Sequence, residues 1–204
     1  AMHIQIIKSG KFGFFIMLLI LLPLCGNIDY VLGLWLVDVP AHTANFVVLV
    51  LLYSLLDGIL TPIAIGVFAQ GEIKAYEIAL CIIYAVNFIA SYVCLKLGMA
   101  PETVFVLNIA FKACVLADLL VHSKAKYAFP VHAFLKQCLL PSAVVFVLSG
   151  AFTYFMPWEA PNSFWEFLLH TLAIIICTSL MALAIGMTKG ERLFLKKNLR
   201  DKIT

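Results

Sequence analysis

An acidic residue lies in the middle of a long apolar stretch of this chain, and a proline follows it. The stretch from Tyr53 to Tyr76 reads YSLLDGILTPIAIGVFAQGEIKAY, with Asp57 and Pro62 five positions apart. A charge at the centre of a bilayer costs about 3 kcal/mol or more, so an acid within a spanning helix marks a candidate site. Because Pro62 cannot donate a hydrogen bond to the carbonyl of Gly58, we expect the helix to bend or open there. Transporters use such broken helices at their binding sites.

Other polar and helix-distorting residues lie within the apolar segments. The candidates for lining a transport route are Asp57, Lys112, Asn87 and Asp118. The candidates for bending a helix are Pro23, Gly58, Pro62 and Gly66.

Lys112 lies so deep in its apolar segment that its charge requires a compensating polar group. It follows Glu102, at the start of an apolar segment, by ten residues, so it lies roughly 15 Å deep in a helix. Its ammonium must face protein or water, or lose its proton. Asp118 lies about 240° further round the same helix, too far for pairing on one face. A depth of about one turn also lets its carboxylate reach interfacial water, which is the alternative to a place on the route.

Asn87 belongs to a polar stripe on an otherwise apolar helix. Tyr84 precedes it by three residues, and Ser91 follows it by four, which is one turn. Hydrogen bonding between helices explains such a stripe as well as a lining of a cavity does. Both interpretations stay open.

The composition places the chain among integral membrane proteins. Of its 204 residues 64% are apolar and 12% are charged, and the mean hydropathy is +1.05. The six cysteines are scattered singly, with no CxxC pair and no histidine at ligand spacing. We therefore expect them to pack as small apolar side chains, without disulfides and without a metal site.

Six segments are long and apolar enough to span a bilayer, which needs about 20 residues each. They cover residues 12–36, 44–69, 76–97, 103–122, 133–156 and 164–187. The predicted fold is an all-α integral membrane bundle of six transmembrane helices. Residues 1–187 form the membrane domain. Residues 188–204 form a basic cytoplasmic tail helix, which begins at the capping-box spacing of Thr188 and Glu191.

The basic residues predict the orientation. One side of the predicted bundle carries Lys8, Lys11, Lys74, Lys124, Lys126, Lys136, Lys189, Arg192, Lys196, Lys197, Arg200 and Lys202. The opposite side carries only Lys96, and Lys112 lies within a span. The positive-inside rule then places both termini in the cytoplasm.

The loops and helix ends together resemble a known family. Residues Lys11 to Gly71 read KFGFFIMLLILLPLCGNIDYVLGLWLVDVPAHTANFVVLVLLYSLLDGILTPIAIGVFAQG, and the similarity continues through GEIKAY, NFIASYVCLKLGMAPETVF and GMTKGERLFL. These stretches resemble the O-antigen type polysaccharide flippases of the multidrug/oligosaccharidyl-lipid/polysaccharide exporter superfamily. The likeness covers nearly the whole chain, although each motif is short.

The resemblance implies transport of a polyprenyl-diphosphate-linked oligosaccharide across the bacterial inner membrane by alternating access. It also implies that this is the C-terminal part of such a transporter, with an N-terminal lobe supplied by the same or another chain. Two positions depart from the family. Ile89 stands where the family often has proline, and Asp118 stands near a position that is often basic, so no phosphate-binding role is carried over to Asp118.

Other functions remain as alternatives. A drug antiporter of the same superfamily would use the acid to couple a cation. A structural membrane subunit, or an inactive fragment without transport of its own, would use Lys112 only to neutralise Asp57. An enzyme acting on a polyprenyl phosphate is disfavoured, because no loop has two acids at ligand spacing and no histidine accompanies a nucleophile. We expect membrane lipid as a partner, no cofactor and no nucleic acid.

Overall fold

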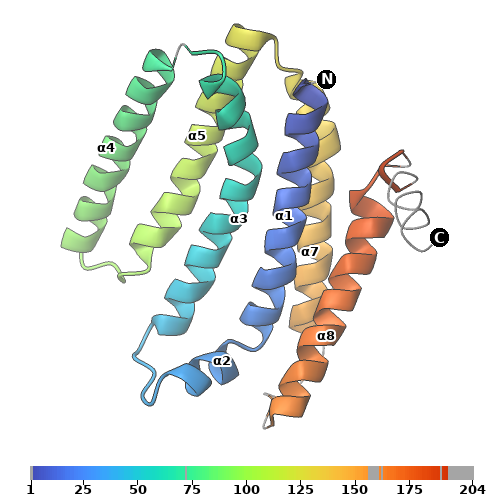
Figure 1. Ribbon diagram of the computed structural model, residues 1–204. Coiled ribbons are helices and arrows are strands. Elements are labelled where there is room, and N and C mark those ends of the chain that lie inside the picture. Colours follow the sequence, from blue (N-terminus) through green and yellow to red (C-terminus); the bar gives the residue numbers. More distant parts are fainter. Residues whose placement is uncertain (1, 72, 156–160, 162, 189, 193–204) are drawn as a thin grey trace.

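Helices joined by short loops make up the computed structural model, which describes residues 2–71, 73–155, 161, 163–188 and 190–192 (Figure 1). The helices are α1 (Met2–Gly26), α2 (Ile28–Trp35), α3 (Thr43–Phe68), α4 (Lys74–Lys96), α5 (Thr103–Tyr127), α6 (Val131–Phe134), α7 (Leu140–Phe155) and α8 (Phe164–Met181). Two π-helical segments, η1 (Leu135–Leu139) and η2 (Ala182–Gly186), join α6 to α7 and extend α8. Among the described residues six helical rods are long and apolar enough to cross a membrane, which confirms the predicted number of spans.

The first span differs from the prediction at both ends. It begins at Met2 rather than at residue 12, and it ends at Gly26, after which α2 turns aside at the end of the bundle (Figure 1). At the break, the Asn27 side-chain amide donates a hydrogen bond to the carbonyl oxygen of Pro23 over 2.9 Å. The early start is allowed because Lys11, expected to flank the membrane, lies buried inside α1 with an acidic partner.

Smaller differences concern the other helix ends. The helix α5 continues to Tyr127 rather than ending near residue 122, so Lys124 and Lys126 lie on its last turns. The rod built from α6, η1 and α7 spans Val131 to Phe155, close to the predicted bounds. Most of the predicted tail helix, residues 193–204, lies outside the described residues.

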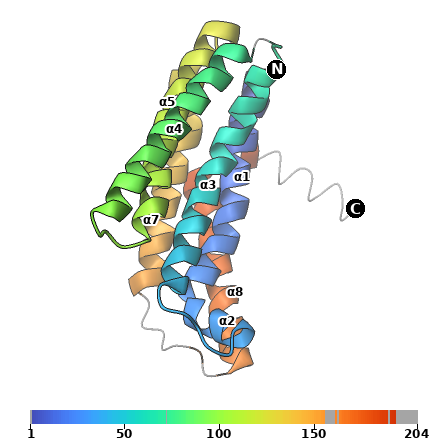
Figure 2. The same ribbon diagram turned by 90° about the vertical axis from the view of Figure 1, so that its left-hand side faces the viewer.

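The helices stand side by side in a row rather than around a closed centre. Contacts join α4 to α5, α5 to α3, α3 to α1, and α1 to both α7 and α8. Figure 1 shows this order across the molecule, and Figure 2 shows that the long helices share one general direction. α1 and α3 therefore form the middle of the molecule, while α4 lies at an edge, packed mainly against α5.

The helices in the middle of the row are more buried than α4 at its edge. α1 is the most enclosed helix, and its Phe14 and Leu18 belong to the same buried apolar core as Ile63 of α3. α4 is the most exposed, with large apolar side chains such as Phe88 and Tyr92 on its outside. Such side chains suit contact with lipid tails, which are as apolar as leucine.

The contact between α1 and α3 depends on glycines. A Cβ added at Gly58 would lie 3.3 Å from the carbonyl carbon of Gly13, and one added at Gly13 would lie 3.2 Å from the carbonyl oxygen of Gly58. A Cβ at Gly10 would lie 3.3 Å from the carbonyl oxygen of Ile59. Small residues let helix backbones approach closely in membranes, so we call Gly10, Gly13 and Gly58 the glycine contact.

Of the residues predicted to bend helices, the two glycines allow close packing between helices. Gly66 makes room for Ile6 and Tyr127, because a Cβ there would lie 2.8 Å from Ile6 Cδ1 and from Tyr127 Oη. α3 continues as one helix through Pro62, and α1 continues for three residues beyond Pro23. Bending at these positions during a transport cycle stays a prediction.

The glycine contact can be tested by Gly58→Val. We expect a loss of about 1–3 kcal/mol of stability, because the new methyl groups meet the α1 backbone, which cannot rotate away as a side chain can. The measurement is the thermal unfolding of the purified chain in detergent. Gly33→Val is the matched control, since a Cβ at Gly33 meets nothing within 4 Å. Equal unfolding temperatures for the two variants would show that the contact is not tight.

Candidate functional site

A charged pair joins α3 to α5 in the middle of their spans. The Lys112 ammonium donates a hydrogen bond to Asp57 Oδ1 and lies 4.1 Å from the centre of the Tyr53 ring. Tyr53 and Asp57 are one turn apart on α3, so one face of this helix presents both to Lys112. The ring face and the carboxylate thus both stabilise the ammonium.

The two charges differ in their exposure. The Lys112 side chain is 7% exposed, whereas the Asp57 side chain is 44% exposed. Asp57 lies 14 residues after the start of α3, which is about 21 Å along the helix, and is therefore near mid-span. A half-exposed carboxylate at that depth is costly against lipid, so this face suits water or another protein.

Amide side chains extend the polar surface from α5 to α4. Asn87 Nδ2 of α4 donates a hydrogen bond to Asn108 Oδ1 of α5 over 2.5 Å. Asn108 lies one turn before Lys112, and Tyr84 lies next to Lys112 and Tyr53 from the side of α4. We call Tyr53, Asp57, Tyr84, Asn87, Asn108 and Lys112 the polar track.

The structure brings together three of the four predicted route residues. Asp57, Lys112 and Asn87 all belong to the polar track. Asn108 was missed by the sequence reasoning, although its spacing of four residues before Lys112 places the two on one helix face. The side-chain oxygen of Asn87 is buried and accepts no hydrogen bond within the described chain.

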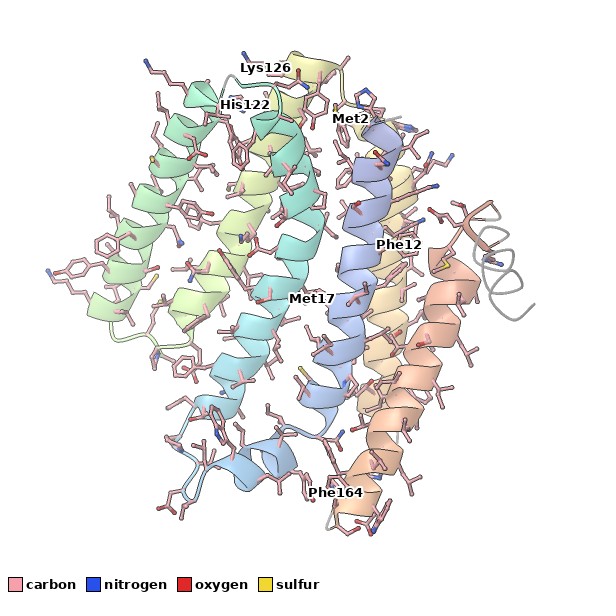
Figure 3. All side chains as sticks on the ribbon, viewed as in Figure 1. Met2, Phe12, Met17, His122, Lys126 and Phe164 are labelled. Atoms are coloured by element: carbon pink, nitrogen blue, oxygen red, sulfur yellow. The ribbon has the colours of Figure 1, made fainter. Side chains whose placement is uncertain are left out.

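Asp118 lies apart from the polar track, near the end of α5. Its Oδ1 is 3.2 Å from Nδ1 of His122, one turn further along the helix. Figure 3 shows His122 near the same end of α5 as Lys126. The His122 ring packs against Tyr76 with 5.9 Å between the ring centres. The structure does not place Asp118 beside Lys112, so these two residues do not act as a pair.

A second polar cluster joins the beginning of α3 to the start of α5. Glu102 precedes the first residue of α5 and accepts hydrogen bonds from Asn45 Nδ2 over 3.2 Å and from the His42 ring. Its own backbone amide and the Asn45 amide lower the pKa of the Glu102 carboxyl. This cluster lies at the opposite end of α5 from Asp118 and His122.

A buried ion pair holds the segment after α8 against α1. Lys11 Nζ donates to Glu191 Oε2 over 2.6 Å, with the Lys11 side chain 1% exposed and that of Glu191 8% exposed. The same oxygen accepts from the backbone N–H of Thr188 over 2.8 Å, which is one half of the predicted capping box. Burial alone would raise the pKa of Glu191, but the hydrogen bonds from Lys11 and Thr188 outweigh it and lower the pKa.

Side chains that bind metals do not gather within the described part of the chain. No three of the His, Cys, Asp and Glu residues placed there come close enough to hold an ion together. The six cysteines are free thiols, and Cys138 is the buried one among them. The polar track therefore offers hydrogen bonds and one compensated charge pair as its chemistry.

No protein family, curated protein or solved structure with which we compared the chain matches it.

The Lys11–Glu191 pair predicts how stability depends on pH. The pKa of Glu191 in the folded state lies below its ordinary value of 4.5. Its stabilising contribution is thus complete above pH 4.5 and is lost as the pH falls through the folded-state pKa. We expect the unfolding temperature of the wild-type chain in detergent to fall over this acidic range, and that of Glu191→Gln to fall less.

A matched control is Glu77→Gln, which neutralises an exposed acid on α4. This variant should keep the wild-type pH dependence. An unchanged pH profile in Glu191→Gln would mean that the ion pair does not contribute to stability.

The Asp57–Lys112 pair predicts the result of exchanging its charges. Asp57→Lys places two cations together at mid-span, and we expect it to lower the amount of folded protein in the membrane several-fold. Adding Lys112→Asp should restore most of this loss, because an opposite pair forms again. The readout is the monodisperse fraction after detergent extraction. If the double variant were no better than the single one, the two residues would not interact.

Proposed function

We propose that the chain is the C-terminal part of a membrane transporter that flips a lipid-linked oligosaccharide across the bacterial inner membrane by alternating access. The observation that carries the proposal is the polar track, and above all the half-exposed carboxylate of Asp57 at mid-span. Contact between this charged group and lipid tails is energetically unfavourable. A water-filled route, or a second lobe facing it, accounts for the exposure.

The arrangement of helices supports a missing neighbour. α4 packs mainly against α5, and the Asp57 carboxylate of the polar track is 44% exposed. The resemblance of residues 11–71 and of the later segments to O-antigen type flippases agrees with this, since it implies an N-terminal lobe opposite these helices. In this proposal the polar track faces that lobe.

The substrate class follows from what the polar track offers. Lys112 supplies a cation that a diphosphate oxygen can approach in place of Asp57. Asn87 and Asn108 carry amides, and Tyr84 carries a phenol, which are groups that exchange hydrogen bonds with sugar hydroxyls. A polyprenyl diphosphate bearing an oligosaccharide presents both kinds of partner.

The basic residues give the proposed orientation. The N-terminus and the loops after α3 and α5 lie at one end of the molecule (Figure 1). Basic residues at or near this end are Lys8, Lys74, Lys124, Lys126 and Lys136. The positive-inside rule makes this the cytoplasmic end, with the N-terminus and the segment after α8 in the cytoplasm. Lys11 is not counted among these basic residues, because it is buried within α1.

A structural membrane subunit is the second candidate. The direct contact between Lys112 and Asp57 favours it, because a neutralised pair between two spans needs no substrate to explain it. A drug antiporter of the same superfamily remains a further alternative, with Asp57 as the site that binds a cation. Competition between substrates in vesicles separates the two transport functions.

The transport proposal is tested by substitution of Asp57 in cells that contain the complete transporter. Asp57→Asn and Asp57→Lys should reduce surface polysaccharide at least tenfold, and Asp57→Asn should do so at unchanged membrane abundance. Asp29→Asn is the matched control, because it neutralises an exposed acid on α2, away from the polar track. Normal export in both Asp57 variants would contradict a role in the route. It would leave the structural subunit as the better explanation.

A further inference from the structure

A cavity of about 400 Å³ lies where α1 ends, between α1, α7 and α8. Its lining includes Cys25 and Asn27 from the end of α1, Gly150 and Thr153 from α7, and His170 from α8. α1 separates it from the polar track, because α3 packs on one side of α1 and α7 and α8 pack on the other. Its volume falls in the range of sites that bind small molecules, about 300–1,000 Å³.

Asn27 is a buried polar residue in the lining of this cavity. Its side chain is 3% exposed, and its Nδ2 donates to the carbonyl oxygen of Pro23. That bond fixes the amide, so Oδ1 is left as an acceptor, and it has no partner among the described groups. A buried acceptor without a hydrogen bond costs about 1–3 kcal/mol. A ligand that donates a hydrogen bond would recover this energy.

The other lining groups select against charged ligands. Thr153 donates its hydroxyl hydrogen to the carbonyl oxygen of Ser149 over 2.9 Å, so its oxygen is left as an acceptor. Among the residues that the structure describes, none of those that line the cavity is an Asp, Glu, Lys or Arg. The ligand that fits is therefore uncharged and rich in hydrogen-bond donors, as a sugar or another polyol is.

The position of the cavity indicates where such a ligand comes from. It lies beside the break between α1 and α2, at the end of the molecule where α8 begins (Figure 1). Trp35 is the last residue of α2, and Trp165 is the second residue of α8. These two side chains are 84% and 71% exposed. Exposed tryptophans gather at the depth of the lipid headgroups, so the cavity opens at that depth.

We propose that this cavity binds the uncharged, hydroxyl-rich headgroup of a membrane glycolipid, with Asn27 Oδ1 accepting a hydrogen bond from a sugar hydroxyl. The acyl chains of the lipid extend along the apolar outer surface of the bundle. This site is independent of the polar track and of the transport proposal, because it uses none of the same residues.

The test is native mass spectrometry of the purified chain in detergent, with glucosyl diacylglycerol as the probe. We expect the protein to retain glucosyl diacylglycerol at least fivefold more than diacylglycerol with the same acyl chains, and more than phosphatidylglycerol or phosphatidylethanolamine. Asn27→Leu removes the acceptor, and Gly150→Leu fills the cavity while leaving Asn27 in place. Each substitution should lower the retention of glucosyl diacylglycerol at least fivefold.

Gly33→Leu is the matched control, since Gly33 lies on α2 outside the cavity lining and a Cβ there meets open space. It should leave retention unchanged. If Asn27→Leu fails to fold, Gly150→Leu decides the question, because space is open around Gly150. Equal retention of all four lipids, no retention of any, or wild-type retention in Gly150→Leu would overturn the proposal. The cavity would then hold water alone.

Discussion

The backbones of α1 and α3 touch because Gly13 and Gly58 carry no side chains, and the rest of the molecule is arranged around that contact. α1 carries α7 and α8 on its other side, and α3 carries α5, which in turn carries α4. Successive residues of a helix point about 100° apart. Gly58 can therefore face α1 while Asp57, its neighbour in sequence, faces α5. The same turn of α3 thus joins the two halves of the row and supplies the acid of the polar track.

The two buried lysines of the described chain, Lys11 and Lys112, each have an acidic partner, but the surroundings of the two pairs differ. Lys11 and Glu191 are both enclosed, so their pair resembles a structural bond between the first helix and the segment after the last one. Lys112 is enclosed and Asp57 is half open. Removing one partner of an enclosed pair leaves an uncompensated buried charge. An open carboxylate can instead exchange its partner for water or for a ligand, which makes this pair the better candidate for function.

Hydropathy and length were enough to predict six spans and an all-helical fold, because crossing a bilayer is a property of each segment alone. The need of Lys112 for a partner also followed from its depth. The residue at which α1 begins could not be predicted from the sequence. Lys11 reads as a flanking charge until its partner is known, and Glu191 lies 180 residues away. Gly58 and Gly66 were predicted to permit bending, but a sequence cannot distinguish a flexible glycine from one that makes room for a neighbouring helix.

The π-helical segments η1 and η2 lie against the same part of α1, with Cys138 next to Gly10 and Gly186 against Phe15. A π-helical turn holds one residue more than an α-helical turn needs. The extra residue is taken up within the wide turn, so the segments before and after η1 keep nearly the rotational phase of an uninterrupted α-helix. Forcing all five residues of η1 into α-helical geometry would instead turn α7 relative to α6 by roughly a quarter of a turn. Phe134, now fully buried, and the buried face of α7 could then no longer point to the core together. The width of this turn therefore aligns the buried faces of the helical segments on its two sides.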